Sequence, residues 1–210
     1  MNRHDSGRFR TESLESVAKR YKTLGFSIIP VHGARNPQQP KLPAIKWARF
    51  QHTHPSDEEL QTWFHDQPKA GIGIVCGRIS RLMVLDFDDA SVASEFRHLH
   101  SDIVHTFTVR SGARGLPHFY YRLPKDKLIT TAAYPGADLR GEGAYVVAPP
   151  TRIGQIEWVV ENDAPIHEIS EFELRRVMRF LAGLQATNGH LSPNVIDTQI
   201  PKVSEFRHLP

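Results

Sequence analysis

The chain has 210 residues, of which 40% are hydrophobic, so it has enough apolar side chains to build a core and is not disordered throughout. Its formal net charge of +3 excludes a histone-like polycation but is compatible with a local basic groove for nucleic acid. Cys76 is the single cysteine, which excludes an internal disulfide framework and a zinc site built on several thiolates.

The sequence lacks the patterns of membrane insertion and of secretion. No apolar segment approaches the ~20 residues that a membrane-spanning helix needs. Residues 1–12 are polar and charged, with no apolar segment behind them. We therefore expect residues 1–12 to be a flexible N-terminus on a cytoplasmic protein, of a cell or a mobile element, that has no membrane partner.

The first elements along the chain are two helices with a strand and a loop between them. Apolar residues at helical spacing predict the first helix, with Thr11 or Ser13 as its cap and Gly25 as its end. Ser56 and Glu59 form a capping box, which predicts where the second helix begins. The predicted elements are a helix over 14–24, a buried strand over 26–31, a proline-rich loop over 32–47 and a helix over 57–66.

The rest of the chain is mostly β structure, with one helix inside it and one after it. Strands are predicted over 71–77, 81–89, 105–112, 118–123, 143–150 and 155–160. Asp89 caps a helix that has Val92, Phe96 and Leu99 on one face. The final helix starts at a Ser170 capping box and ends at Gly183, before a polar tail. Helices that flank a run of strands favour an α+β domain with a mixed or antiparallel sheet.

Two acids lie side by side on the strand with the strongest apolar pattern. Asp86 and Asp88 are two residues apart, so on a strand they point to the same face as Val84, while Leu85 and Phe87 point to the other. Carboxylates this close repel each other unless a divalent cation lies between them. The alternative is that these acids only end the strand and cap the next helix.

A third acid, Asp138, strengthens the interpretation that these acids bind a divalent cation. Phosphoryl and nucleotidyl transfer commonly use several carboxylates to hold two metal ions roughly 3.5–4 Å apart. Mg²⁺ or Mn²⁺ suits such oxygen ligands. Glu142, in the glycine turn that follows, is a possible substitute for Asp138.

The segment 109–121 has the residues of a phosphate-binding turn. Its glycines let backbone N–H groups approach phosphate oxygens, and Ser111, Arg114 and His118 supply further donors or charge. No Gly-Lys-Ser/Thr sequence follows the glycines, so the segment is not a Walker A loop. The alternative for His118 is an ordinary structural or surface histidine.

The order of these motifs resembles one known family. The chain has an apolar strand ending in DFD, then SGARGLPH, then ADLRGEGAYVVAPPT, preceded by LGFSIIPVHG and PKLPAIKW. This order resembles the primase-polymerase domain of the archaeo-eukaryotic primase superfamily, in its bifunctional DNA primase/polymerase branch. The resemblance implies an RRM-like catalytic sheet packed with a smaller N-terminal α/β unit. It also implies a catalytic domain over 13–165, a C-terminal helix over 166–186 packed on or extending that domain, and a tail or linker over 187–210.

The resemblance also implies roles for individual residues. Asp86, Asp88 and Asp138 match the acids that hold the metal ions and carry the catalysis. His118 matches the motif that contacts the phosphates of the incoming nucleotide, although Leu116–Pro117 lengthens the turn before it. The remaining nucleotide-binding candidates are Ser111, Gly112, Arg114, Arg140 and Lys41.

The resulting hypothesis is template-directed nucleotidyl transfer with two Mg²⁺ or Mn²⁺ ions. The expected partners are a DNA template and primer, dNTP or NTP, and a helicase or accessory domain such as relatives often carry. Arg35, Lys46 and Arg49 would line the nucleic-acid side, or else form an ordinary solvated face. A metal-dependent nuclease and a non-catalytic nucleic-acid-binding module on the same fold are the alternatives.

Overall fold

The computed structural model describes residues 12–110, 112 and 114–188. The helices of this part are α1 (Leu14–Thr23), α2 (Asp57–Phe64), α3 (Ala90–Leu99) and α4 (Glu171–Asn188), with short 3₁₀ turns η1 (Gly33–Arg35) and η2 (Ala48–Gln51). The strands are β1 (Ser27–Val31), β2 (Gly71–Val75), β3 (Leu82–Phe87), β4 (Thr108–Arg110), β5 (Pro117–Arg122), β6 (Ala132–Tyr134), β7 (Ala137–Arg140), β8 (Tyr145–Ala148), β9 (Arg152–Ile153), β10 (Ile156–Glu157), β11 (Val159–Asn162) and β12 (His167–Glu168).

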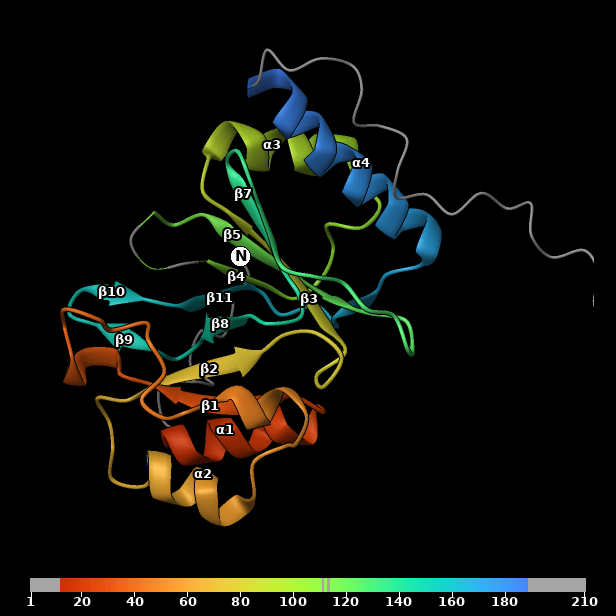
Figure 1. Ribbon diagram of the computed structural model, residues 1–210. Helices are drawn as coiled ribbons and strands as arrows, with labels where there is room; N and C mark the ends of the chain where they lie inside the picture. The colour runs from red at the N-terminus through yellow and green to blue at the C-terminus, as the bar shows by residue number, and fades with distance from the viewer. Residues whose placement is uncertain (1–11, 111, 113, 189–210) are drawn as a thin grey trace, which may run out of the picture.

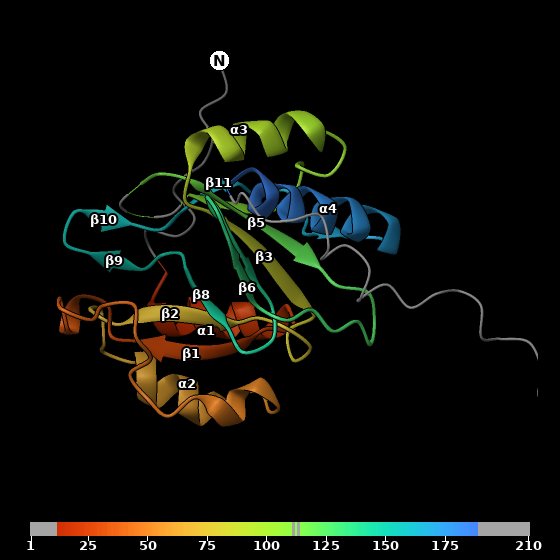
Figure 2. The same cartoon turned by 45° about the horizontal axis from the view of Figure 1, so that its top comes forward.

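Two main sheets organise the molecule. The larger has seven strands in the order β11-β4-β5-β3-β7-β6, with β12 beside β5, and the smaller has the order β1-β2-β8. All the pairings in these two sheets are antiparallel except β12 with β5, so the expectation of an α+β fold with a mixed sheet is confirmed. Helices α1 and α2 lie beside the smaller sheet, and α3 and α4 lie at the opposite end against the larger one (Figures 1 and 2).

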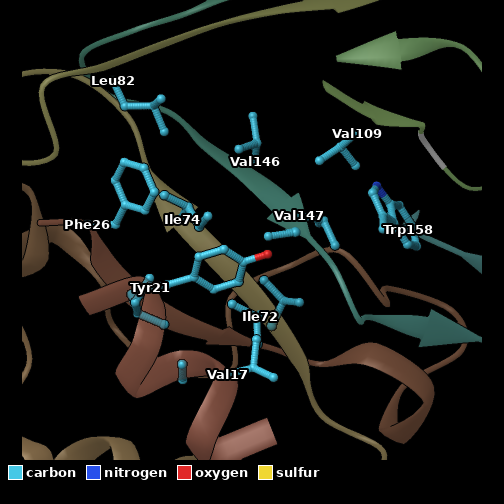
Figure 3. Close-up of a cluster of buried hydrophobic side chains, with 14 of the residues drawn as sticks. Val17, Tyr21, Phe26, Ile72, Ile74, Leu82, Val109, Val146, Val147 and Trp158 are labelled. Carbon is cyan, nitrogen blue, oxygen red and sulfur yellow. The ribbon is translucent and has the colours of Figure 1, made fainter. Parts of the chain in front are cut away.

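Two apolar clusters pack on the two faces of strand β3. Leu82 and Val84 belong to a cluster shared with α1, α2 and the smaller sheet. Figure 3 shows this layer, where Leu82 and Val146 come from different sheets and Tyr21 comes from α1. Leu85 and its alternate neighbours on β3 belong instead to the cluster shared with α3 and α4. Because side chains alternate between the two faces of β3, this strand contributes to both clusters and joins the two halves of the fold.

The predicted helix starts are confirmed by their capping contacts. Ser13 caps α1. Ser56 and Glu59 exchange the two hydrogen bonds of a capping box, at 3.2 and 2.9 Å. Ser170 and Glu173 do the same at the start of α4, at 3.3 and 2.7 Å. These short-range contacts satisfy backbone N–H groups that have no partner inside the helix.

Two predictions about helix ends and faces were wrong. Gly183 does not end the last helix, because α4 continues to Asn188. Leu99 does not face the core with Phe96, since it is 52% exposed and the buried neighbour of Phe96 on α3 is Ala93. An isolated glycine is tolerated inside a helix when tertiary packing holds the turns on either side of it.

The strands after residue 130 differ most from the sequence-based expectation. Strands β6 and β7 were not predicted, because a short hairpin turning at Gly136 has no long apolar run. The predicted strand over 155–160 is two strands, of which β10 pairs with β9 and β11 pairs with β4. Pairing partners far along the chain decided both outcomes.

No helix in the described ranges is long and apolar enough to cross a membrane. The expectations for a flexible N-terminus and for a C-terminal tail fall almost entirely on residues 1–11 and 189–210, which lie outside the described residues.

Candidate active site

Three of the predicted site residues form a row across the centre of the larger sheet. Strand β3 lies between β5 and β7, and Asp86 is paired with His118 on one side and with Asp138 on the other. Directly opposite residues of antiparallel strands project to the same face, with Cβ atoms about 4.5–5.5 Å apart. Residues 52 positions apart along the chain, Asp86 and Asp138, are thus brought together by strand register.

The row faces the layer between the two sheets. Val84 belongs to the apolar cluster shared with the smaller sheet, and Asp86 is the next residue on the same face of β3. The side chains of Asp86 and Asp138 are 19% and 21% exposed, so both are largely withdrawn from water. The side chain of His118 is 6% exposed. Two partly buried carboxylates on one face need positive charge beside them.

A basic side chain contacts each of the acids. His118 Nε2 lies 2.8 Å from Asp86 Oδ1. Arg140 Nη2 lies 2.5 Å from Asp138 Oδ2 and 3.5 Å from Asp86 Oδ2, so it reaches both acids of the row. Arg114 Nη1 lies 2.6 Å from the carboxylate of Asp88, which follows the end of β3.

The pKa values of the two acids in the row move in opposite directions. Burial disfavours ionisation of Asp86, but the hydrogen bond and charge of His118 and the charge of Arg140 hold its pKa below the usual value. Burial raises the pKa of Asp138, and repulsion from Asp86 adds to this effect while Arg140 opposes it. A cation beside Asp86 and Asp138 would therefore make it easier for both acids to be ionised at once.

The donor chemistry of Asp86 and Asp138 fits a hard divalent cation. Both offer carboxylate oxygens on facing positions, and Mg²⁺ is commonly bound by one or two carboxylates together with water and substrate phosphates. Asp88 is turned to Arg114, with its side chain 49% exposed. Across the described ranges, no group of three or more His, Cys, Asp or Glu residues is placed to hold a metal ion. In this structure Asp88 pairs with Arg114 rather than joining Asp86 and Asp138 in such a group.

Glu142, the possible substitute for Asp138, has a different role. Its Oε1 accepts a hydrogen bond from the backbone N–H of Arg78 at 2.6 Å, beside Gly77. It therefore holds the turn between β2 and β3 rather than joining the row of acids.

The predicted phosphate-binding turn lies against the side chains of Ile156 and Trp158. Gly112 packs against Ile156 and Trp158, and a side chain at position 112 would collide with Ile156. Arg114, two residues on, reaches Asp88. The prediction for Ser111 falls on a residue outside the described ranges.

Lys41 is brought to the same region by aromatic contacts that the sequence reasoning missed. Its Nζ lies 5.5 Å from the centre of the Trp158 ring. Its backbone oxygen accepts a hydrogen bond from the hydroxyl of Tyr145 at 3.0 Å. Tyr145 in turn packs edge-on against Trp47. Lys41 is near enough for its charge to act on Asp86. Trp158 has no local motif around it that could have marked this role, whereas Tyr145 lies inside the segment ADLRGEGAYVVAPPT.

The remaining basic candidates have different surroundings. Arg35 donates to the backbone oxygen of His32, and Lys46 is exposed. Arg49 pairs with Glu59 of α2 and lies over the ring of Phe50. The side chain of Arg49 is still 59% exposed, so all three basic residues remain candidates for contact with nucleic acid.

A cavity of about 1110 Å³ shares Trp158 with the region around Lys41 and Gly112. It is lined by the start of α1, the end of α2 and strand β11, and none of the candidate site residues contributes to it. The lining has one arginine, Arg152, against five acids, which makes it unsuited to a triphosphate; the acids are Glu12, Asp66, Glu157, Glu161 and Asp163. The chemistry therefore points to the row of acids and not to the cavity.

Comparison with known proteins gave one family match. A family model described as "Bifunctional DNA primase/polymerase, N-terminal" matches residues 18–172, which is most of the chain and includes every candidate residue named above. No curated protein matches.

Proposed function

Because the chain belongs to the bifunctional DNA primase/polymerase N-terminal family, we propose that it is a template-directed nucleotidyltransferase that extends a 3′-hydroxyl with nucleoside triphosphates. The family points to DNA primase or polymerase activity, and a domain with that activity binds DNA and nucleotides. The observation that supports the finer proposal is the row of Asp138, Asp86 and His118 across three adjacent strands.

The proposed reaction replaces a phosphoanhydride bond of the nucleoside triphosphate by a phosphate ester bond to the primer. The 3′-oxygen forms a bond to the α-phosphorus of the incoming nucleotide, and the bond from that phosphorus to the bridging oxygen breaks. Pyrophosphate leaves, and the proton of the 3′-hydroxyl passes to solvent. Positioning and charge neutralisation supply most of the catalysis in such transfers.

Asp86 and Asp138 are the proposed metal ligands, with Asp88 as the third once it leaves Arg114. Bound Mg²⁺ or Mn²⁺ would lower the pKa of the attacking hydroxyl and neutralise the leaving pyrophosphate. His118 holds Asp86 in place through its contact of 2.8 Å. We therefore assign His118 a positioning role. Its second ring nitrogen, Nδ1, is buried and has no partner among the described residues. The contact of His118 with phosphate stays a prediction.

Basic groups around the acids are the proposed triphosphate ligands. Arg114 and Arg140 already contact the acids, and Lys41 is close enough for its charge to act on Asp86. Because Gly112 has no side chain, its backbone can lie against Ile156 and Trp158. Ser111 remains a predicted donor to phosphate. Arg35, Lys46 and Arg49 are the proposed nucleic-acid contacts. A helicase partner and an origin in a mobile element stay predictions.

Primer extension tests the proposal. The full chain is incubated with a primed DNA template, or with template alone, and with dNTP or NTP in Mg²⁺ or Mn²⁺. We expect wild type to extend the primer and Asp86→Asn and Asp138→Asn each to lose at least ~100-fold in rate. Asp102→Asn is the matched control, because Asp102 also pairs with an arginine, Arg176, but lies outside the row.

Two outcomes would overturn the proposal. Strand cleavage without incorporation would identify a metal-dependent nuclease, and DNA binding without either reaction would identify a binding module. Circular dichroism on each variant separates loss of chemistry from loss of fold.

A further inference from the structure

One guanidinium group spans the two acids at the centre of the site. Arg140 is two residues after Asp138 on β7, so both side chains project from the same face of the strand. Its Nη2 contacts Oδ2 of Asp138 at 2.5 Å and Oδ2 of Asp86 at 3.5 Å. One nitrogen of Arg140 therefore contacts a carboxylate oxygen of each acid across the β3–β7 pair.

The fit of Arg140 is adequate for charge but incomplete for hydrogen bonding. Its Nε is buried and has no partner among the described residues. A buried donor that lacks an acceptor costs free energy. The contact with Asp86 is at the outer limit of a hydrogen bond. Arg140 thus offsets part of the charge of the two acids without forming a fully satisfied network, as expected of a group that can be displaced.

A second arginine has the same relation to the third acid. Arg114 Nη1 lies 2.6 Å from Oδ1 of Asp88. The two side chains are 63% and 49% exposed, so water weakens this pair more than the inner one. Each of the three proposed metal ligands is thus contacted by an arginine.

We propose that Arg140, and to a smaller extent Arg114, is a built-in counter-ion that competes with the divalent cation for the carboxylate oxygens of the site. The inference rests on the proposed function, because it takes Asp86 and Asp138 as metal ligands. A cation that binds these oxygens must displace the guanidinium groups. The displaced groups are then free beside the acids, where a triphosphate needs positive charge.

The competition predicts an effect that a simple supporting role would not produce. Arg140→Gln removes the competing charge. We therefore expect the nucleotide-free variant to bind Mn²⁺ at least about fivefold more tightly than wild type does. Arg140→Lys keeps a competing charge and should stay closer to wild type. Arg114→Gln should give a smaller increase, because its pair is exposed.

Free Mn²⁺ measured by electron paramagnetic resonance gives the dissociation constants for the full chain without nucleotide. Arg176→Gln is the matched control, since it also removes an arginine that pairs with an aspartate, and we expect no change in Mn²⁺ affinity. Thermal unfolding in chelator and in Mn²⁺ is the second measurement. Arg140→Gln should unfold at a lower temperature in chelator and gain more from Mn²⁺ than wild type does.

Unchanged or weaker Mn²⁺ binding by Arg140→Gln would overturn the inference, and so would the absence of Mn²⁺ binding in every variant. If Arg140→Gln does not fold, the affinity of the exposed variant Arg114→Gln decides the question. Primer extension decides the proposed function separately, because Mn²⁺ affinity is measured without any nucleotide or DNA.

Discussion

Asp86 and His100 show two ways in which this fold treats an ionisable side chain that it removes from water. Asp86 keeps its charge because His118 and Arg140 lie beside it, so burial does not raise its pKa above the usual value. His100 instead stacks on Phe96 with ring centres 4.5 Å apart. Burial lowers the pKa of His100, and the nearby charge of Arg176 adds to this effect. The imidazole is therefore held neutral.

His100 predicts a loss of stability in mild acid. Its pKa in the folded state lies below the unfolded value of about 6.5, so its contribution is present above that pH and is lost as the pH falls below it. Relative to wild type, His100→Phe should therefore gain free energy of unfolding as the pH falls from about 7.5 to about 5. Urea denaturation at several pH values measures the difference.

His98→Asn is the control for His100→Phe, because His98 lies exposed on the same helix and should show no such trend. A difference between His100→Phe and wild type that stays constant with pH would contradict this account.

At the scale of elements, the hairpin of β6 and β7 places Asp138. Gly136 forms its turn with a φ of +79°. The backbone oxygen of Gly136 accepts hydrogen bonds from the N–H groups of Asp88 and Asp89, at 2.9 and 3.2 Å. A side chain at this position would come within 2.9 Å of Asp89 and Val92. This close approach ties the start of β7 to the end of β3, which puts Asp138 opposite Asp86.

Gly136→Ala should therefore disturb both stability and chemistry. The positive φ and the contacts with Asp89 and Val92 predict a loss of at least ~1 kcal/mol in the free energy of unfolding. A shift of β7 should also lower the rate of primer extension. Chemical denaturation and primer extension measure the two effects.

The same substitution at Gly183 is the matched control, since Gly183 lies inside α4 and, apart from the backbone of its own helix, no described residue comes within 4 Å of an added Cβ. Gly183→Ala should stabilise the protein by roughly 0.5–1 kcal/mol and leave the extension rate unchanged. Equal effects at the two positions would contradict the proposed role of Gly136.

At the scale of the whole molecule, strand β3 couples the two halves. Leu82 is fully buried in the cluster shared with the smaller sheet, and Met83 is fully buried in the cluster shared with α3 and α4. The row of acids lies on the first of these faces, so its geometry depends on both sheets at once. Interiors packed on two faces of one strand unfold together.

Leu82→Ala tests this coupling. Removal of a fully buried leucine should lower the free energy of unfolding by about 2–5 kcal/mol. Tryptophan fluorescence reports on the half around the smaller sheet, because all three tryptophans pack into its clusters. Circular dichroism includes α4 in the other half. The two transitions should coincide in wild type and in the variant; separate transitions would show that the sheets unfold independently.

Short-range features of this protein could be predicted from its sequence. Ser56 with Glu59, and Ser170 with Glu173, predict helix starts because a capping box needs only residues that are three apart. The alternation along β3 predicts that Asp86 shares a face with Val84. The order of the motifs along the chain also predicts the family, and the family model confirms it.

Only the tertiary structure decided the strand register that places Asp86 between His118 and Asp138. The same is true of the salt bridges that Arg114 and Arg140 form with the acids of the site. The tertiary structure also decided that α4 continues through Gly183. The physical reason is range. Periodicity and capping depend on neighbours within a few residues, whereas register and salt bridges depend on packing between segments tens of residues apart, which no local pattern records.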